Sequence, residues 1–462
     1  METFIGRHKE LSALEAAFGA KGSGLIPIYG RRRVGKSELI RRFFRGKRGV
    51  YFVGKRAPGP LLVSEFLREA AVALDEPLLA SYAARSWKDA LEVVVDRGKG
   101  RGKLVVALDE FQWIVDSSPD LPSVLQELWD RRWSRGNEVL LILCGSYVGF
   151  MEREILGRKS PLFGRRTAQI LVKPFGYEEA ALFHPAYSTV DRARTYFVCG
   201  GVPLYLRAFS DDRSVEHNIA ANFLDEYAAL YREPEFLLRE ELRELASYDA
   251  ILEALANGAT SATELSRRTG VGNRALHYYL KQLVELGYVA RRFPLTGRPP
   301  APRQVRFSLE DPLLRFWFRF VFPNSSFVQQ AGGARAFAER VRPGLDAYFG
   351  LCFERVCREA LPGLYAREGV QAGYDVGEYW DREVQIDVVG LRRDGWVDLG
   401  ECRWGPVRSA RALVAELDAR VSRYPNPKGA TIGRRLFTRA PVGGRRDEKG
   451  VRWHTLEDLY RC

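Results

Sequence analysis

Short apolar runs alternate with charged segments in the first third of the chain. Three of these runs lie at residues 25–29, 103–108 and 138–145. Runs of this length that end in glycine or polar residues are typical of buried strands in a parallel sheet that is covered by helices. The pattern therefore predicts an α/β domain at the N-terminus.

The middle of the chain changes to a helical pattern. Residues 174–245 are charged, with apolar positions at helical spacing, and they predict a helical region. Residues 248–294 begin with three short helical segments, of which the last two are separated by a glycine-containing turn. Two strands around a Gly/Pro-rich tip follow within residues 287–309. This order predicts a winged helix-turn-helix.

Helix and hairpin patterns return after a polar boundary near residue 325. Residues 347–361 form an amphipathic pattern that predicts a helix. Residues 384–391 and 396–404 predict two strands joined by the tight turn RRDG, and residues 409–421 predict a further helix. The C-terminal part is therefore expected to be a second α/β domain.

Composition narrows the class of protein. The 462 residues are 46% hydrophobic and 28% charged, which is typical of a folded soluble protein. No apolar run reaches the roughly 20 residues that span a bilayer, and the charged start METFIGRHKEL is unlike a signal peptide. We therefore expect a cytoplasmic protein that has no membrane partner.

Charge and cysteine usage bear on the partner and the compartment. The formal net charge is +13 and the isoelectric point is near 9.5, which favours a polyanionic partner. An arginine-rich surface of a thermophilic or high-GC organism is an equally good interpretation of the charge. The six cysteines form no CxxC pair and no cluster with zinc spacing, so we expect buried free thiols in a reducing compartment.

A phosphate-binding motif follows the first predicted strand. Gly30, Gly35, Lys36 and Ser37 fill the pattern GxxxxGK[ST]. In such a loop the glycines let backbone N–H groups approach phosphates, the lysine reaches the β- and γ-phosphate oxygens, and the hydroxyl binds Mg²⁺. The motif predicts ATP or ADP with Mg²⁺ as the bound cofactor. The neighbouring residues that we also expect at the nucleotide are Arg33, Val34 and Glu38.

The second and third apolar runs end in polar residues that suit the same site. Asp109 is expected to hold Mg²⁺, and Glu110 is expected to polarise the attacking water. Capping of the next helix is the alternative, although a phosphate loop needs a carboxylate partner at a strand end. Ser146 is expected on a strand between the other two, where it would sense the γ-phosphate or simply form a turn.

This region resembles the P-loop ATPases of the AAA+ and STAND kind. FIGRHKEL resembles their adenine-side motif, GGVPLYL resembles the GxP motif of their helical lid, and SPLFGRR matches a signature of the archaeal-type branch. The resemblance implies contacts to the adenine, to the lid, and to the γ-phosphate in cis or in trans. Ile5, Gly6 and Arg7 are expected near the adenine, and Pro203 in the lid. Arg165 and Arg166 are expected at the γ-phosphate. For the two arginines, a solvated basic loop is the alternative.

Basic residues occupy both elements of the predicted winged helix. Arg274, His277 and Lys281 recur at spacings of three and four, on one face of the second helix of the helix-turn-helix. The wing carries Arg291, Arg292, Arg298, Arg303 and Arg306. These positions fit contacts with a DNA groove and with phosphates. The alternative is a winged helix that serves packing or dimerisation.

Three acids and an arginine are expected together in the C-terminal domain. Glu354 lies on the predicted helix, Asp387 on the first strand of the hairpin, and Glu401 and Arg403 on the second strand, two apart and therefore on one face. The set resembles the PD-(D/E)xK restriction-endonuclease-like fold. The resemblance implies that Asp387 and Glu401 bind Mg²⁺ or Mn²⁺ and that all four residues serve DNA cleavage.

Arg403 departs from this pattern, which has lysine at that position. Arginine keeps its proton and carries a bulkier, planar charged group. It could stabilise charge that develops at phosphorus, or it could pair with Asp387 or Glu401 in a site without metal. We therefore expect the nuclease-like fold and leave cleavage open.

Over nearly its whole length the chain resembles archaeal-type ATPases with a DEXX-box-ATPase C-terminal domain. The expected fold class is a multidomain α/β protein with an αβα P-loop core (1–173), a helical lid (174–245), a winged helix (246–325) and a restriction-endonuclease-like domain (326–462). The expected function is an ATP-hydrolysing switch that couples nucleotide state to a DNA-binding winged helix and a nuclease-like domain. The alternative is a nucleotide-regulated, DNA-binding or homo-oligomerising scaffold whose nuclease-like domain is inactive.

Overall fold

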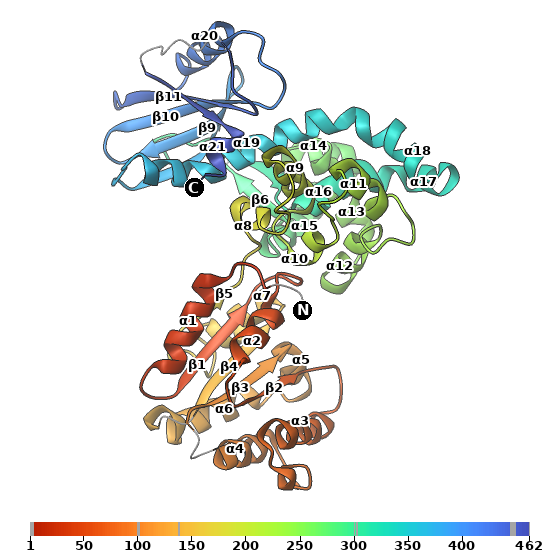
Figure 1. Cartoon of the computed structure of the whole chain (residues 1–462), viewed down its shortest axis with the longest axis vertical. Helices are drawn as coiled ribbons and strands as arrows, with labels where there is room; N and C mark the ends of the chain where they lie inside the picture. Colours follow the sequence, from red (N-terminus) through yellow and green to blue (C-terminus); the bar gives the residue numbers. More distant parts are fainter. Residues whose placement is uncertain are drawn as a thin grey trace. The chain divides into compact units, whose positions relative to one another are not determined.

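The computed structural model of the chain consists of two compact units, shown in Figure 1. It describes residues 4–98, 102–136, 139–299, 301, 304–443 and 450–461. The first unit comprises Met1–Pro174 with Val202–Leu204, and the second comprises Phe175–Gly201 with Tyr205–Cys462. Arg303, predicted above as a wing residue, lies outside the described residues. No described helix is long and apolar enough to cross a membrane.

A five-stranded parallel sheet in the order β2-β3-β4-β1-β5 forms the centre of the first unit. Its strands are β1 (Gly24–Tyr29), β2 (Gly49–Val53), β3 (Leu104–Asp109), β4 (Val139–Gly145) and β5 (Ile170–Leu171). The three predicted strands correspond to β1, β3 and β4, which are buried along their whole length. Because β4 pairs with both β1 and β3, the prediction that it lies between them is confirmed.

Helices cover both faces of this sheet. They are α1 (His8–Gly19), α2 (Lys36–Phe44), α3 (Gly59–Leu74), α4 (Trp87–Gly98), α5 (Phe111–Ser117), α6 (Leu121–Arg131) and α7 (Val148–Phe150). Successive strand residues point to opposite faces. Val105 and Ala107 therefore pack with α1 and α2, whereas Leu104, Val106 and Leu108 pack with α3 to α6.

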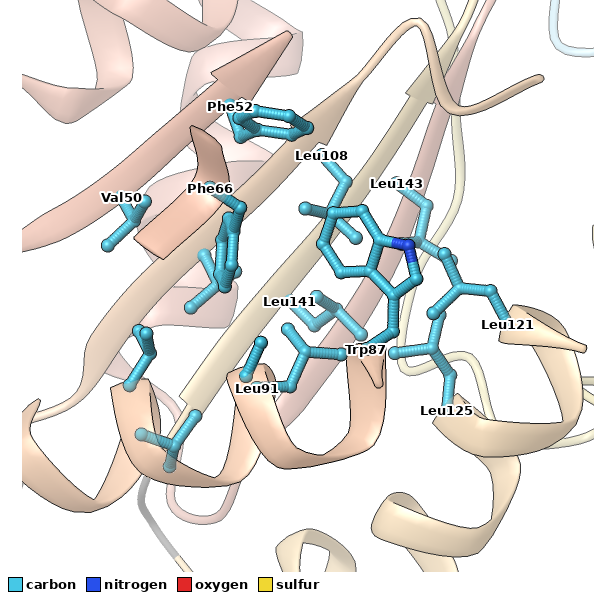
Figure 2. Close-up of a cluster of buried hydrophobic side chains, with 14 of the residues drawn as sticks. Val50, Phe52, Phe66, Trp87, Leu91, Leu108, Leu121, Leu125, Leu141 and Leu143 are labelled. Atoms are coloured by element: carbon cyan, nitrogen blue, oxygen red, sulfur yellow. The ribbon is translucent and has the colours of Figure 1, made fainter. Parts of the chain in front are cut away.

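The larger of these two cores is organised around aromatic rings. Figure 2 shows the Trp87 ring beside Leu108 of β3 and Leu121 of α6. Phe52 and Phe66 meet edge to face, with ring centroids 5.7 Å apart. Burial of an aromatic or leucine side chain contributes roughly 1.5–3 kcal/mol each to folding, so this layer holds the sheet and its loops in place.

The second unit begins with short helices and a winged helix. The first helices are α8 (Tyr177–Ala181), α9 (Thr189–Cys199), α10 (Pro203–Arg207), α11 (Val215–Phe223) and α12 (Glu233–Glu241). The winged helix follows as α13 (Leu245–Ala256), α14 (Ala262–Thr269), α15 (Asn273–Glu285), β6 (Val289–Arg292) and β7 (Arg306–Leu309). The three helices and the antiparallel β6–β7 pair agree with the predicted helix-turn-helix and wing.

A mixed sheet in the order β12-β11-β10-β9-β8 closes the chain. The elements that lead into it and form it are α16 (Pro312–Phe316), α17 (Ser325–Ala331), α18 (Gly333–Ala336), α19 (Arg342–Arg367), β8 (Tyr374–Trp380), β9 (Gln385–Arg392), β10 (Trp396–Arg403), α20 (Ala410–Val421), β11 (Thr431–Thr438), β12 (Val451–Thr455) and α21 (Leu456–Leu459). β8, β9 and β10 are antiparallel neighbours, whereas β10 and β11 are parallel and connected through α20. The predicted hairpin and both predicted helices are confirmed.

The wing packs on this sheet rather than standing free. Leu295 joins the apolar cluster that includes Tyr379 and Tyr424, and its N–H donates to the Glu378 carbonyl oxygen at 2.7 Å. The Tyr424 hydroxyl donates to the Leu295 carbonyl oxygen at 3.1 Å. The winged helix and the C-terminal sheet therefore share an apolar core.

Candidate nucleotide-binding and catalytic site

The phosphate loop is built on two glycines with positive φ. Gly30 has φ +151° and Gly35 has φ +90°, and α2 begins at the next residue. A Cβ at Gly30 would lie 2.2 Å from the Val172 carbonyl oxygen, so a larger residue would displace the backbone there. Strand, loop and helix N-terminus thus form the geometry in which backbone N–H groups and the helix dipole face an anion.

Lys36 is held inside this loop. Its ammonium donates to the carbonyl oxygens of Gly30 and Arg31, at 2.8 Å each. Burial lowers the pKa of this lysine, and the charges of Glu110 and Asp109 oppose the shift. The side chain therefore lies where the motif predicts a phosphate-binding cation.

Asp109 gathers hydroxyl groups at the end of β3. Its Oδ2 accepts hydrogen bonds from the Ser37 hydroxyl at 2.7 Å and from the Tyr51 hydroxyl at 2.5 Å. Its Oδ1 accepts the Glu110 N–H at 2.8 Å. The carboxylate is almost fully buried, and its proximity raises the pKa of Tyr51 beyond the effect of burial. The structure thus joins Ser37 and Asp109, the two residues predicted to hold Mg²⁺.

Glu110 is oriented by two polar neighbours. Its backbone is left-handed, with φ 49°, at the position before α5, and its side chain makes no capping hydrogen bond. Oε2 instead accepts the Ser146 hydroxyl at 3.0 Å and the amide of Gln112. The amide also donates to the Ser146 hydroxyl at 3.2 Å. The helix-capping interpretation is therefore not needed for Glu110, and Ser146 lies beside it.

Among the residues predicted on the adenine side, Arg7 contacts the phosphate loop. Arg7 is buried, with φ 61°, and donates to the Val34 carbonyl oxygen at 2.9 Å and to Glu10 at 3.1 Å. Gly6 before it also has positive φ. Arg7 thus fixes the phosphate loop, and a contact of Ile5, Gly6 or Arg7 with the base stays a prediction.

Pro203 lies at the phosphate loop, although it is distant in sequence. A Cβ at Gly35 would lie 3.7 Å from Pro203 Cγ, and Val202–Leu204 belong to the compact unit that contains the loop. This position agrees with the predicted lid motif. Gly201 lies two residues earlier, and a Cβ there would clash with the Phe175 backbone. The Phe175 N–H donates to the Gly201 carbonyl oxygen at 2.8 Å.

The two arginines of the archaeal-type signature have partners within their own unit. Arg165 forms a bidentate pair with Asp130 at 2.8 and 2.7 Å and also donates to loop carbonyls. Arg166 donates to the Leu156 carbonyl oxygen at 3.3 Å. A role at the γ-phosphate, in cis or in trans, stays a prediction for both.

Two site residues were not predicted from the sequence. Tyr51 bonds to Asp109, and Gln112 bonds to both Glu110 and Ser146. Gln112 follows the Asp–Glu pair by two residues and could have been suspected from that spacing. Tyr51 gives no such signal, because only the pairing of β2 with β3 brings it beside Asp109.

The four residues predicted for nuclease chemistry come from α19, β9 and β10 and lie near one another. Burial and the nearby charge of Asp387 raise the pKa values of Glu354 and Glu401, and the charges of Arg403 and Arg420 oppose this shift at Glu401. Asp387 is buried as well, and its Oδ2 accepts the Cys402 N–H at 3.0 Å. Buried carboxylates this close compete to carry a negative charge.

Arginines occupy both oxygens of the Glu401 carboxylate. Arg403 contacts Oε1, and Arg420 from α20 contacts Oε2 at 2.5 Å. Both arginines also pair with Glu416, at 2.7 and 3.5 Å. Within the described part of the chain, no group of three or more His, Cys, Asp or Glu side chains is arranged to hold a metal ion. Glu401, which was predicted as a metal ligand, therefore has both carboxylate oxygens paired with arginines.

The predicted DNA-contacting residues divide into exposed and packed ones. Arg274, His277 and Lys281 of α15 are exposed, as are Arg291 and Arg298 of the wing. Other wing arginines are used in packing. Arg292 pairs with Glu310 at 2.8 Å, and the Arg306 guanidinium lies 4.6 Å from the Trp380 ring centroid. Arg292 and Arg306 thus have partners within the protein, and phosphate contacts by the wing arginines stay a prediction.

Comparison with protein families agrees with this order of elements. Residues 4–209 match a family described as an ATPase domain predominantly from Archaea. Residues 250–292 match the IclR helix-turn-helix domain, and residues 317–413 match a family described as Archaea bacterial proteins of unknown function. The fold and the site thus agree with an ATPase domain of the P-loop class, followed by a helix-turn-helix that is similar to the IclR domain.

Individual relatives are distant. An uncharacterised protein of Methanocaldococcus jannaschii is 28% identical over 393 residues, which cover 84% of each chain. An uncharacterised ATP-binding protein of the same organism is 44% identical over 45 residues, which cover 10% of this chain and 76% of that protein. The structure of a Walker-type ATPase of Pyrococcus abyssi is 20% identical and has a TM-score of 0.51, covering 68% of this chain and 96% of that chain. This last likeness supports the fold.

Proposed function

We propose that this protein is a Mg²⁺-dependent ATPase that acts as a nucleotide-controlled switch of the AAA+/STAND type and binds DNA through its winged helix. The 2.7 Å hydrogen bond between Ser37 and Asp109 carries the proposal, because it joins the phosphate loop to the acidic strand end. Lys36 lies in the same loop. Together these groups form the two halves of a Mg–nucleotide site.

The donor set fits Mg²⁺. Hydroxyl and carboxylate oxygens, supplemented by phosphate oxygens, are the ligands that this ion prefers. Ser37 and Asp109 would hold it, and the bound ion would neutralise charge on the β- and γ-phosphates. Lys36 would then donate to the same phosphate oxygens instead of to the loop carbonyls.

The Glu110 carboxylate would act as the general base that activates the attacking water. Its carboxylate accepts hydrogen bonds from Ser146 and Gln112, so its orientation is fixed before any substrate binds. From this position it would accept a hydrogen bond from water and draw a proton as the water attacks the γ-phosphorus. Ser146, bonded to the same carboxylate, would report the state of the γ-phosphate to this pair.

DNA binding is proposed for the exposed face of α15. Arg274, His277 and Lys281 lie on this face with Tyr278, which is 60% exposed. Cationic and aromatic side chains on a recognition helix suit a groove lined by phosphates and base edges. The net charge of +13 supports the same partner.

For the C-terminal domain we propose a scaffold rather than an active nuclease. The order of α19, three antiparallel strands, α20 and a parallel strand supports a restriction-endonuclease-like arrangement as part of this proposal. As arranged, however, the Glu401 carboxylate does not fit a metal ion, because Arg403 and Arg420 occupy both of its oxygens. Cleavage by this domain is the second candidate function, favoured only by the proximity of Glu354, Asp387 and Glu401.

The test compares Lys36→Ala with wild type in ATP binding and turnover. Calorimetry with Mg–ATP should give binding for wild type and for Lys21→Ala, an exposed lysine in the same unit, and none for Lys36→Ala. A Lys36→Ala protein with wild-type affinity would contradict the assignment of the nucleotide site. Nucleotide-dependent changes in DNA affinity, measured by fluorescence anisotropy, test the switch.

A further inference from the structure

A cavity of about 600 Å³ lies between the wing and the C-terminal sheet. It is lined by the wing tip Thr296–Arg298, the β9–β10 turn with its flanking strand residues, the loop from Tyr424 to Ala430, and Asp375 of β8. We refer to it as the wing–sheet cavity. It is distinct from the Glu354, Asp387 and Glu401 cluster, because it is lined by the hairpin-turn end of β10 and not by Glu401.

Both sides of the wing tip are anchored, so the position of the cavity is fixed. On one side the partly buried Leu295 packs against the cluster that contains Tyr379 and Tyr424, and its N–H donates to the Glu378 carbonyl oxygen at 2.7 Å. On the other side Arg306 lies over the Trp380 ring and donates to the Gln385 side chain at 3.4 Å. The cavity therefore forms part of one packed unit, and its lining groups are preorganised.

Three exposed cations line this cavity without a carboxylate partner. They are Arg298 from the wing, Arg393 from the turn and Lys428 from the loop. Among the described residues, no hydrogen bond or ion pair involves the charged group of any of them. Lys428 lies close to the wing tip, since its Cε is 4.0 Å from the position that a Cβ would take at Gly297.

This absence of partners contrasts with the surrounding arginines. Arg292 pairs with Glu310, Arg392 pairs with Asp394, and Arg434 pairs with Asp418. Asp375 is the acid among the lining residues, so the cations outnumber it there. Charges that converge without protein counterions form a local positive potential that favours an anionic ligand.

We propose that the wing–sheet cavity binds the phosphodiester backbone of the DNA contacted by the winged helix. The inference rests on the DNA binding proposed above and adds the C-terminal domain to the interface. Exposed cations from three segments suit an extended strand that enters and leaves the cavity, rather than a small ligand that must be enclosed. Backbone contacts of this kind position a duplex without reading its sequence.

The test uses the full-length protein and a labelled duplex of random sequence. The variant Arg298→Glu/Arg393→Glu/Lys428→Glu is compared with Lys21→Glu/Arg68→Glu/Arg85→Glu, which makes the same charge change at exposed positions of the first unit. Fluorescence anisotropy is measured over a series of salt concentrations. Each lost phosphate contact lowers the slope of log K against log salt by about one, so we expect a slope lower by about three and affinity reduced about tenfold or more.

Controls separate the possible failures. A milder variant with glutamine at the same three positions should give a smaller loss in the same direction, and thermal unfolding like that of wild type shows that both variants fold. Wild-type protein that does not bind DNA would contradict the proposed function itself. If wild-type protein binds DNA and the cavity variant binds it with the same affinity and salt dependence, only the proposal for the cavity is overturned. The same holds if the cavity variant binds DNA normally and loses only the binding of a mononucleotide.

Discussion

The Ser37 hydroxyl and the Asp109 carboxylate meet at 2.7 Å, across 72 residues of sequence. Ser37 is the second residue of α2 and Asp109 is the last residue of β3, and β4 lies between β1 and β3 in the sheet. This strand order brings the phosphate loop and the acidic strand end to one edge of the sheet. The pair is therefore a sensitive point at which to test the proposed site.

Replacement of Ser37 by alanine should raise the Mg²⁺ concentration needed for half-maximal ATP turnover. A hydrogen bond to a charged group contributes roughly 1.5–3 kcal/mol, which corresponds to about tenfold or more in the midpoint. Ser37→Thr keeps the hydroxyl and is the matched control. Equal Mg²⁺ midpoints for the alanine variant and wild type would exclude Ser37 as a ligand.

Replacement of Glu110 by glutamine should separate binding from hydrolysis. The amide cannot accept a proton from water, so kcat should fall about 10²- to 10⁴-fold while the ATP affinity stays close to wild type. Phosphate release and calorimetry measure the two quantities. If kcat fell less than about fivefold, another group would have to activate the water.

His454 should make the C-terminal sheet sensitive to acid. Burial, followed by the charge of Arg435, lowers the pKa of this histidine to about 4 from an ordinary value of 6.5. Between pH 6.5 and 4 the unfolded chain binds more protons than the folded one, so stability falls as pH falls through this window. The loss is at most roughly 3 kcal/mol.

The variant His454→Gln tests this linkage. The amide can accept from Arg435, whose Nη1 lies 3.1 Å from His454 Nε2, but it does not titrate. Thermal unfolding between pH 7 and pH 4.5 should therefore show a smaller drop in Tm for the variant than for wild type. Parallel pH profiles would show that His454 carries no share of the acid sensitivity.

Arg420 should stabilise the C-terminal domain more than its exposure indicates. Its removal leaves one oxygen of the buried Glu401 carboxylate without a cation, and such losses cost about 1–3 kcal/mol. Glu416→Ala is the matched control, since it removes a half-exposed partner of the same arginines and should cost less than about 1 kcal/mol. Chemical denaturation measures both values.

The same region gives a prediction about DNA cleavage. With Glu401 held by two arginines, wild-type protein should nick supercoiled plasmid in Mg²⁺ or Mn²⁺ no faster than Asp387→Ala does. Nicking by wild type that the Asp387→Ala change abolishes would establish the nuclease and refute the scaffold proposal.

The sequence was most informative where chemistry and local pattern coincide. Lys36, Asp109 and the three buried strands could be predicted because a phosphate loop needs a strand before it and a carboxylate strand beside it. The hairpin of β9 and β10 could be predicted because its turn and alternation are local. In each case the signal lies within about ten residues of the element that it describes.

Other contacts depend on packing between distant segments and left no such signal. Arg403 was recognised as a possible partner of Glu401, but Arg420 lies on a separate helix and reads as an ordinary exposed position. The basic wing looked like a DNA-binding element throughout, whereas Arg306 is held over Trp380. The sequence shows that a residue is charged, whereas its neighbours in the folded chain determine whether that charge faces solvent or is paired within the protein.

The position of Leu295 has a practical consequence for dividing the protein into fragments. A fragment that ends at residue 325 would retain the wing but lose Tyr379 and Tyr424, which cover this leucine. The newly exposed apolar surface would favour aggregation, and the free wing tip would sample many conformations. DNA affinities measured on an excised winged helix would therefore describe a different molecule from the intact chain.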